Sequence, residues 1–584
     1  MLRTHTCGEL SLKEKAKEVT LCGWVHTNRN HGGIIFVNLR DRYGVTQLVF
    51  DSKHNKEAYH FAEKLNREDV LKATGKVRYR GKDLVNKKMS TGEVEILVDA
   101  VEMLNKSAAL PIEPEDANNS DDIRLKYRYL DLRRPAMQEK MILRHNVAFA
   151  VREFLSSQKF LEIETPLLMK STPEGARDYV VPSRVNVGQF YALPQSPQLY
   201  KQILMVSGFD RYFQLPRCLR DEDLRADRQP EHTQIDLEMS FVQPDDVFEL
   251  VENMFKFIFK KVLKKDLKFP FKRLSYKESM EKYGNDKPDL RFGLELVDVS
   301  SLVKDCEFGV FSSAVKSKGI VKGVVAEGCA GFSRKQVDKY IDFAKTLGGK
   351  GLAWMKVTEE GLDGGCSKFF DVEMQGQLIK KMKASPGDLL LFCADSYKVV
   401  NDVLSKIRVR LGKELKVIDE SAFAFSWVTQ FPLFEWDSDR KKWNAMHHMF
   451  CMPLEEDMKY LEEDPGRVHC TQYDLALNGT ELGSGSIRIH KPELQERVMK
   501  VVGFSLEEAQ SRFGFLLESF KYGAPPHGGI ALGLDRVVAL LCGLTDIREV
   551  IAFPKNKHAQ GLMDGCPSII DKEQLKELGI SLKK

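Results

Sequence analysis

The most constraining stretch of this sequence is a strand-like segment whose two faces differ in character. In "HTQIDLEMSF" (residues 232–241), every second residue from Ile235 is apolar, and the residues between are polar and include Asp236 and Glu238. Successive side chains of a strand point to opposite faces of a sheet. One face therefore covers a core, whereas a strand with a purely structural role would seldom carry two carboxylates at the middle of the other.

A block of mixed charge precedes this strand. In "RDEDLRADRQ" (residues 220–229) seven of ten residues are charged, and the apolar segment "YFQLPRCL" comes before it. We predict that the block is the long loop of an antiparallel hairpin. Such blocks are most often solvated loops whose charges pair with each other. The alternative is that their arginines bind phosphate oxygens in bidentate fashion beside the polar strand face.

Length, charge and cysteine usage set wide bounds. A chain of 584 residues exceeds one core, so two to four domains are expected. The net charge of +4 neither demands nor excludes a nucleic-acid partner. No signal peptide and no apolar run of about 20 residues occurs, which argues against a membrane span. The 11 cysteines are scattered without a C-x-x-C pair, which argues against zinc and against a disulfide framework. We expect a cytoplasmic, thiol-reduced protein.

Residues 1–105 contain five strand-like segments, with a helical segment between the third and the fourth. This order fits a small Greek-key barrel of the OB type. Such barrels commonly hold single-stranded nucleic acid by aromatic stacking and basic contacts. This segment offers Arg29, Phe36, Arg78, Arg80 and Lys82 for that purpose. The alternative is that Phe36 belongs to the core and the basic residues form a solvated face, and the pattern alone favours neither.

The rest of the chain divides by composition. Residues 106–135 are polar and interrupted by proline, as expected of a linker or hinge. Residues 136–287 begin with a long amphipathic helix, and Pro166 in the following apolar run indicates an edge strand or an interface. Residues 288–418 read as a compact α+β unit without a dense cluster of catalytic residue types. That density resumes over 419–584, so the unit is predicted to be inserted into a larger catalytic domain.

Two further segments carry candidate site residues. In "YDLALNGTELGSGSIRIH", the Asn-Gly pair at 478–479 predicts a hairpin, and Asp474 and Glu481 bracket the turn. Paired carboxylates of this kind can hold Mg²⁺ beside phosphates. In "GGIALGLDRVVALL", a strand runs into a helix that begins near Asp535, with Arg536 in a first turn whose amides favour anions. Either segment alone is more often plain architecture than a site.

Together these segments resemble the class II aminoacyl-tRNA synthetases, and among them the bacterial-type aspartyl-tRNA synthetases. The resemblance covers essentially the whole chain. Its three signature motifs are "FLEIETP", "CLRDEDLRADRQPEHTQIDLEMSF" and "GLDR", and further matches are "STPEGARDY", "QSPQLYKQ", "AMHHMF", "DKPDLR" and "IREVIAFPK". It implies an α+β multidomain chain: an N-terminal OB-fold anticodon domain, a hinge, an antiparallel catalytic sheet with flanking helices, and an inserted α+β domain. It also implies a homodimer built partly around Pro166.

The resemblance implies a two-step reaction with ATP, L-aspartate and tRNA. An aspartate carboxylate attacks the α-phosphorus of ATP and displaces pyrophosphate. The aspartyl group then passes from the adenylate to the terminal ribose hydroxyl of tRNA, and AMP leaves. Catalysis is then positioning and charge neutralisation. By resemblance, the catalytic residues are Arg220, Glu222 and Arg536, and Mg²⁺ is held by Asp474 and Glu481 without zinc. The implied ATP-binding residues are Arg220, Asp221, Glu222, Gln229, Glu481, Gly533, Leu534, Asp535 and Arg536.

The resemblance also names the residues that bind aspartate. Lys201 and Arg488 would hold its side-chain carboxylate, and an isosteric asparagine would leave both cations unpaired, which is costly. His447 would close over the substrate. The remaining implied contacts are Glu174, Ser196, Gln198, Arg220 and Asp236.

Four positions depart from the family pattern. They are Leu219, His232, Met449 and Ser484. None removes a charged site residue, so the implied activity stands, but the shape of the pocket near His447 and Ser484 stays open.

The choice of tRNA depends on the barrel. By resemblance, Arg29, Phe36 and Gln47 meet the anticodon through backbone or base-edge contacts, stacking and base hydrogen bonds. The anticodons of tRNA-Asp and tRNA-Asn differ only at the last base. His31 stands where aspartate-only enzymes commonly carry leucine, which favours an enzyme that charges both tRNAs. The alternatives are a strictly tRNA-Asp-specific enzyme, a sister synthetase for lysine or asparagine, and a non-catalytic RNA-binding relative.

Overall fold

The computed structural model describes residues 1–113, 118–172 and 175–582. Within these ranges the chain forms two compact units. The first comprises Met1–Met141 together with Ala552–Asn556 and Gln560–Pro567, and the second is chiefly Ile142–Ile551. The functional residues predicted from the sequence fall into both units, so each unit is described by itself.

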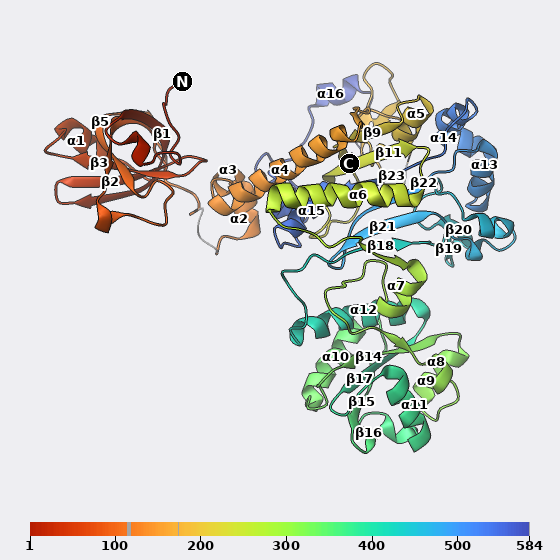
Figure 1. The fold of residues 1–584 in the computed structure, drawn as a ribbon. Coiled ribbons are helices and arrows are strands. Elements are labelled where there is room, and N and C mark those ends of the chain that lie inside the picture. The colour runs from red at the N-terminus through yellow and green to blue at the C-terminus, as the bar shows by residue number, and fades with distance from the viewer. Residues whose placement is uncertain (114–117, 173–174, 583–584) are drawn as a thin grey trace. The chain divides into compact units, whose positions relative to one another are not determined.

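The first unit contains a closed barrel with the strand order β1-β2-β3-β5-β4 (Figure 1). Its elements are β1 (Glu18–His31), β2 (Ile34–Arg40), β3 (Val45–Asp51), α1 (Lys56–Ala62), β4 (Val70–Tyr79) and β5 (Val94–Asn105), with short helical turns at Leu12–Glu14 and Lys82–Leu84. Alternate side chains fill the interior, as Ile35, Val37 and Leu39 do in β2. This arrangement confirms the predicted OB-type barrel.

The segment predicted as a hinge is partly helical. It contains α2 (Asp121–Lys126) and α3 (Arg128–Asp131). Arg124, Arg128 and Arg134 donate hydrogen bonds of 3.0, 2.6 and 2.9 Å to the buried carboxylate of Asp131. Burial raises the pKa of Asp131, but the three arginines outweigh it and lower the pKa. Residues 106–135 resemble a linker in the sequence because the side chains that hold these helical turns together are charged and not apolar.

The second unit is built on one large sheet with the order β12-β18-β21-β22-β23-β11-β9-β6, and β10 pairs with β11 (Figure 1). Neighbouring strands are antiparallel except β12 with β18 and β6 with β9. The strands are β6 (Leu161–Glu162), β9 (Arg211–Gln214), β10 (Arg217–Leu219), β11 (Glu231–Ser240), β12 (Lys272–Ser275), β18 (Phe425–Thr429), β21 (Gln472–Leu477), β22 (Thr480–Ile487) and β23 (His527–Gly533). A large antiparallel sheet with flanking helices was predicted, and the structure confirms it.

The main core lies on one face of this sheet. There Ile235, Leu237 and Met239 of β11 belong to a cluster shared with α4 (Pro135–Ser157), α6 (Pro244–Ile258) and α15 (Leu534–Leu541). The other face of β11 carries Asp236 and Glu238, both wholly buried, and meets α5 (Gln198–Val206). The alternation seen in the sequence thus separates core from polar site, as predicted.

Between the neighbouring strands β12 and β18 the chain builds a second sheet, with the order β13-β14-β17-β15-β16. Its strands are β13 (Val297–Asp298), β14 (Ile320–Ala326), β15 (Ala353–Thr358), β16 (Gly361–Asp363) and β17 (Leu389–Asp395), and its helices are α8 (Ser300–Val303), α9 (Gly309–Lys316), α10 (Arg334–Thr346), α11 (Val372–Met382) and α12 (Tyr397–Glu414). Separate apolar clusters join α10 and α12, and α9 and α11, to the sheet. Ser333 caps α10 through a capping box. This is the α+β unit that the sequence predicted here.

The remaining elements surround the large sheet. They include the paired strands β7 (Val180–Pro182) and β8 (Phe190–Ala192), the paired strands β19 (Phe434–Asp437) and β20 (Lys442–Ala445), and the helices α7 (Tyr276–Tyr283), α13 (Pro492–Val501), α14 (Leu506–Phe520) and α16 (Lys572–Glu577). Short helical turns lie at Phe259–Leu263, Ser367–Phe369, Glu455–Tyr460, Pro465–Arg467 and Ile547–Val550. None of the helices in the described ranges combines the length and the apolar character that crossing a membrane requires.

Candidate active site

A cavity of about 410 Å³ opens over the polar face of β11, β22 and β23 and the first turns of α5. Most of the residues predicted for ATP and aspartate line it: Ser196, Gln198, Lys201, Arg220, Glu222, Gln229, Asp236, His447, Glu481, Arg488, Gly533, Asp535 and Arg536. Asp221, Asp474 and Leu534 are not among the lining residues, and Glu174 lies outside the described residues. The fold therefore gathers residues from distant parts of the sequence around one space.

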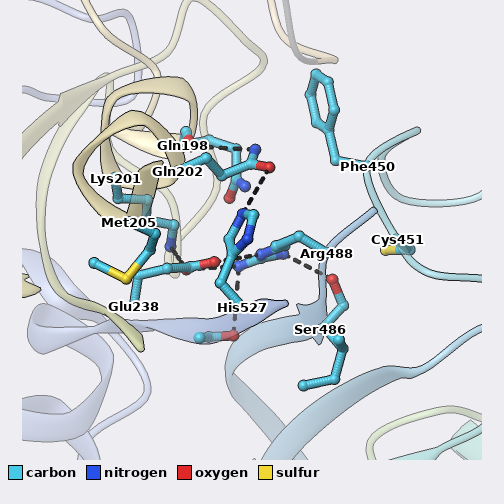
Figure 2. Close-up of polar contacts among 12 residues, drawn as sticks. Gln198, Lys201, Gln202, Met205, Glu238, Phe450, Cys451, Ser486, Arg488 and His527 are labelled. Carbon is cyan, nitrogen blue, oxygen red and sulfur yellow. Dashed lines mark hydrogen bonds and ion pairs between the residues drawn. The ribbon is translucent and has the colours of Figure 1, made fainter. Parts of the chain in front are cut away.

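Four charged side chains form a buried network at one end of this cavity, and Figure 2 labels three of them, Lys201, Glu238 and Arg488. Lys201 Nζ lies 2.9 Å from Asp236 Oδ2 and 3.3 Å from Glu238 Oε2. Arg488 donates from Nε and Nη2 to the two oxygens of Glu238, at 2.9 and 3.2 Å. At most 1% of any of the four side chains is exposed. Two cations balance two anions, which is how buried charges are tolerated.

The two carboxylates of this network titrate differently. Burial raises the pKa of Asp236 to about 6, because Lys201 offsets only part of the lost hydration. Burial also raises the pKa of Glu238, but Arg488 and Lys201 outweigh it and bring that pKa to about 2. Two buried polar atoms at this end, Asp236 Oδ1 and Gln198 Nε2, have no hydrogen-bond partner within the described part of the chain. A ligand with a cationic and a carbonyl-like group could satisfy both.

Arg488 is held on its other side by residues that the sequence did not single out. Its Nη1 donates to Ser486 Oγ at 2.8 Å and to His448 Nε2 at 3.0 Å, and Nη2 also approaches the carbonyl of Gly529 at 3.4 Å. All N–H groups of the guanidinium therefore have a protein partner. The available signal was the double histidine of "AMHHMF", of which only His447 was assigned a role.

The other end of the cavity carries the charged block. Arg220 follows β10, lines the cavity and donates from Nε to the carbonyl of Gln195 at 3.4 Å. Glu222 pairs with Arg228 at 3.0 Å. The charges of the block thus pair partly with each other, as in a solvated loop, and partly face the cavity. Arg536, in the first turn of α15, donates from Nη1 to the carbonyl of Glu481 at 2.9 Å.

Two of the predicted ATP-binding residues, Asp535 and Leu534, and the variant position His232 make further contacts in this structure. Asp535 accepts from Thr233 N at 2.8 Å and pairs with Arg144, so its carboxylate ties α15 to β11. The Leu534 side chain belongs to the core cluster beneath the sheet. His232 lines the cavity, and burial together with the charges of Arg220 and Arg536 lowers its pKa to about 3, which keeps the ring neutral.

The carboxylate pair suits a divalent cation. Asp474 on β21 and Glu481 on β22 lie on adjacent antiparallel strands. Burial, and then the charge of Glu481, raises the pKa of Asp474 well above its ordinary value. No cluster of three or more His, Cys, Asp or Glu side chains that could hold a metal occurs among the described residues. Two carboxylates fit Mg²⁺, which takes one or two protein carboxylates and completes its shell with phosphates and water.

The predicted anticodon residues lie on neighbouring strands of the barrel. Arg29 of β1 is paired in register with Phe36 of β2. The rings of His31 and Phe36 meet edge to face, with centroids 5.8 Å apart. Gln47 of β3 donates from Nε2 to Glu95 Oε2 at 2.8 Å, and Glu95 also accepts from Arg78. Phe36 is therefore not a core residue, since alternate residues of β2 fill the interior.

Comparison with known proteins identifies both parts of the chain. Residues 120–557 match the family described as tRNA synthetases class II (D, K and N), and residues 19–104 match the OB-fold nucleic acid binding domain. A relative from Desulfatibacillum aliphaticivorans, named aspartate–tRNA(Asp/Asn) ligase, is 53% identical over 100% of this chain and 98% of its own. One from Ruminiclostridium cellulolyticum, named aspartate–tRNA ligase, is 50% identical over 100% and 98%. The crystal structure of an asparaginyl-tRNA synthetase from Pyrococcus horikoshii, complexed with asparaginyl-adenylate, matches 95% of this chain and 98% of that one with a TM-score of 0.59 at 18% identity, a likeness of fold.

Proposed function

Because this chain belongs to the class II tRNA synthetases of the aspartate, lysine and asparagine group, we propose that it is an aspartate–tRNA ligase. It activates L-aspartate with ATP to aspartyl-adenylate and transfers the aspartyl group to the 3′ end of tRNA. The full-length relatives named as aspartate–tRNA ligases support this choice within the group. The single observation that carries it is the pair of buried cations, Lys201 and Arg488, at one end of the cavity.

These cations select a carboxylate side chain. Lys201 has three N–H donors, and two carboxylates, Asp236 and Glu238, already face it. Arg488 uses every N–H, so a substrate carboxylate replaces one of its present partners, and His448 is the partner that lines the cavity. An asparagine amide would turn its NH₂ toward one of these cations, and a lysine side chain would add a third positive charge. Both are strongly disfavoured in a buried site.

The α-ammonium of aspartate fits the other polar atoms at this end. Asp236 Oδ1 is a buried acceptor without a partner, and Gln198 and Ser196 line the same wall. An ammonium there would restore the charge balance that a substrate carboxylate disturbs. The α-carboxylate then points toward Arg220, where the α-phosphate of ATP would lie.

The chain's own residues promote the first step by position and charge. Arg220 neutralises charge on the α-phosphate as the carboxylate attacks, which is a contribution made mainly in the transition state. Arg536 binds the far end of the triphosphate, and Glu222 and Gln229 hold the adenosine. Asp474 and Glu481 would hold Mg²⁺, which when bound supplies charge neutralisation at the phosphates. The adenylate carries its own leaving group, so no side-chain nucleophile is required for transfer to tRNA.

The barrel is proposed to bind the anticodon of tRNA-Asp and also that of tRNA-Asn. Phe36 offers a ring for stacking, Arg29 a cation beside it, and Gln47 an amide for base edges. His31 follows at the end of β1, next to Gly32 and Gly33, whose positive φ values of 55 and 96° favour glycine. A polar residue in this turn tolerates either last base. A relative named aspartate–tRNA(Asp/Asn) ligase supports the relaxed alternative, whereas the name aspartate–tRNA ligase of another relative specifies no tRNA.

The chain is further proposed to act as a cytoplasmic homodimer. β6 forms the outer edge of the large sheet, and Leu161, Leu167 and Leu168 near it are at least half exposed. An apolar sheet edge of this kind is normally covered. Pro166 lies among these residues and cannot donate a ladder hydrogen bond.

Amino-acid-dependent exchange of pyrophosphate into ATP tests the proposal. Aspartate should support exchange, whereas asparagine and lysine should not. Exchange with asparagine or lysine in place of aspartate would make the protein a sister synthetase. Absence of exchange with all three would favour a non-catalytic RNA-binding relative.

A further inference from the structure

His527 lies behind the aspartate-binding residues and is bonded to both elements that carry them. It is the first residue of β23, is wholly buried and is not among the residues that line the cavity. Its carbonyl accepts from the backbone N of Arg488 at 2.8 Å. Its ring contacts the amide of Gln202 on α5 at 3.3 Å (Figure 2). One residue thus joins the strand end at Arg488 to the helix of Gln198 and Lys201.

The hydrogen bonds of the ring restrict the Gln202 amide. His527 Nδ1 lies 2.7 Å from the carbonyl of Pro525, and because a carbonyl only accepts, Nδ1 carries a proton. A neutral ring then accepts at Nε2 from the Gln202 NH₂, and an imidazolium donates there to the Gln202 oxygen. Which end of an amide faces a partner is set by such networks. In the structure the Gln202 oxygen lies toward His527 Nε2, which leaves the amide nitrogen for the carbonyl of Gln198.

Gln202 in turn contacts Gln198, which lines the cavity. Its amide nitrogen lies 3.4 Å from the main-chain carbonyl of Gln198, the first residue of α5. Gln198, Lys201, Gln202 and Met205 are all buried, as expected for positions i, i+3, i+4 and i+7 on one helix face. A helix face this polar needs a partner for each group. Glu238 and Asp236 form ion pairs with Lys201, and His527 is hydrogen-bonded to Gln202.

We propose that His527 is a positioning residue for amino-acid recognition: through Gln202 it fixes the first turns of α5, and with them Gln198 and Lys201, relative to Arg488. This inference rests on the proposed function, because it assigns the same cavity end to aspartate. His527 itself touches no reacting atom.

Two substitutions separate the two nitrogens of the ring. In His527→Asn the amide nitrogen takes the place of Nδ1 and keeps the bond to Pro525, whereas in His527→Gln the amide takes the place of Nε2 and keeps the bond to Gln202. In pyrophosphate exchange, H527N should raise the KM for aspartate about tenfold, the expected effect of one broken buried hydrogen bond, and leave the KM for ATP within about twofold. H527Q should stay within about threefold of wild type for both. The reverse order would assign His527 to the Pro525 turn alone and overturn the inference.

A double-mutant cycle tests whether the effect runs through Gln202. Gln202→Met removes the amide at similar size and should raise the aspartate KM about tenfold by itself. In this background H527N should add nothing further, and additive effects would contradict the inference. If H527N does not fold, Q202M, which keeps the ring and its bond to Pro525, carries the test alone, and an unchanged aspartate KM overturns the inference. Loss of aspartate-dependent exchange in wild type would instead overturn the proposed function, so the two failures are distinct.

Discussion

Glu238 and Arg488 form a doubly hydrogen-bonded ion pair in the interior of the second unit, with Nε–Oε1 and Nη2–Oε2 distances of 2.9 and 3.2 Å. Glu238 is also 3.3 Å from Lys201, so one carboxylate orients both cations that face the cavity. A cation held in this way loses little freedom when it binds a second carboxylate. The selectivity proposed for this site therefore depends on a residue that does not itself line the cavity.

Removing the shared anion should destabilise the fold and weaken aspartate binding. Glu238→Gln leaves two buried cations with one carboxylate, and breaking a buried pair in this way costs about 3 kcal/mol of unfolding free energy. Urea denaturation measures this loss, and exchange kinetics measure the rise in aspartate KM. The matched control is Glu462→Gln, which removes an exposed bidentate pair with Arg497 and should change stability by less than about 1 kcal/mol. Equal effects of the two substitutions would contradict this role of Glu238.

Arg220 should be essential for adenylate formation. Arg220→Ala should lower the exchange rate by about a hundredfold or more, because the transition-state charge loses its main donor. The control is Arg217→Ala on the preceding strand β10, whose side chain pairs with Glu231 and does not line the cavity. Near-normal exchange by the Arg220 variant would remove this residue from the mechanism.

The carboxylate pair should govern the response to magnesium. Glu481→Gln should shift the Mg²⁺ titration of exchange to higher concentration and raise the KM for ATP, because a neutral amide is a poorer ligand for a hard cation. Binding of tRNA, measured by filter retention, should be unchanged. A titration that superimposes on that of wild type would exclude Glu481 as a ligand.

Titration of Asp236 should make the kcat/KM for aspartate fall at acidic pH. Its pKa, raised to about 6 by burial, means that the carboxyl is protonated below that pH and no longer attracts the substrate ammonium. The kcat/KM for aspartate should then fall about tenfold for each pH unit below 6.

The protein should stay folded over the pH range in which kcat/KM falls. The raised pKa of Asp236 costs stability in full above pH 6, and this cost shrinks as the pH falls from 6 to about 4. Glu238, with a pKa of about 2, contributes stability that persists until the pH falls below about 4.5. Circular dichroism at pH 5 should therefore match that at pH 7. A kcat/KM that stays flat from pH 7 to 5 would show that Asp236 is ionised throughout.

The sequence predicts the frame of this site better than its inner layer. Alternation along β11 separates Ile235 from Asp236 and so reveals the polar face, and the Asn-Gly pair at 478–479 places Asp474 and Glu481 on adjacent strands. Both inferences use local rules that tertiary structure seldom overrides. The resemblance to a known family then supplies the roles of individual residues.

What the sequence does not reveal is which polar residues face each other across the sheet. Glu238 and Arg488 are 250 positions apart, and His448 and Ser486 become important only because both contact the same guanidinium. Likewise, the turns around Asp131 read as a linker because their order depends on three arginines that converge in space. Charge pairs that form through long-range contacts leave no periodic signal.

His31 should control the breadth of tRNA use. Its ring meets Phe36 at the end of β1, and His31→Leu should lower aspartylation of tRNA-Asn while leaving that of tRNA-Asp near wild type, because leucine packs against one base only. His60→Leu, on α1 of the same barrel, is the matched control and should change neither. Equal losses on both tRNAs in the His31 variant would point to general damage of the barrel.

The most direct measurement is the initial rate at which the purified protein transfers labelled aspartate to tRNA-Asp and to tRNA-Asn, assayed side by side. We predict aspartylation of both, with rates within about tenfold of each other, a difference of about 1.4 kcal/mol. A rate on tRNA-Asn about a thousandfold lower, near 4 kcal/mol of discrimination, would make the enzyme specific for tRNA-Asp. Absence of aspartylation on both tRNAs would contradict the account as a whole.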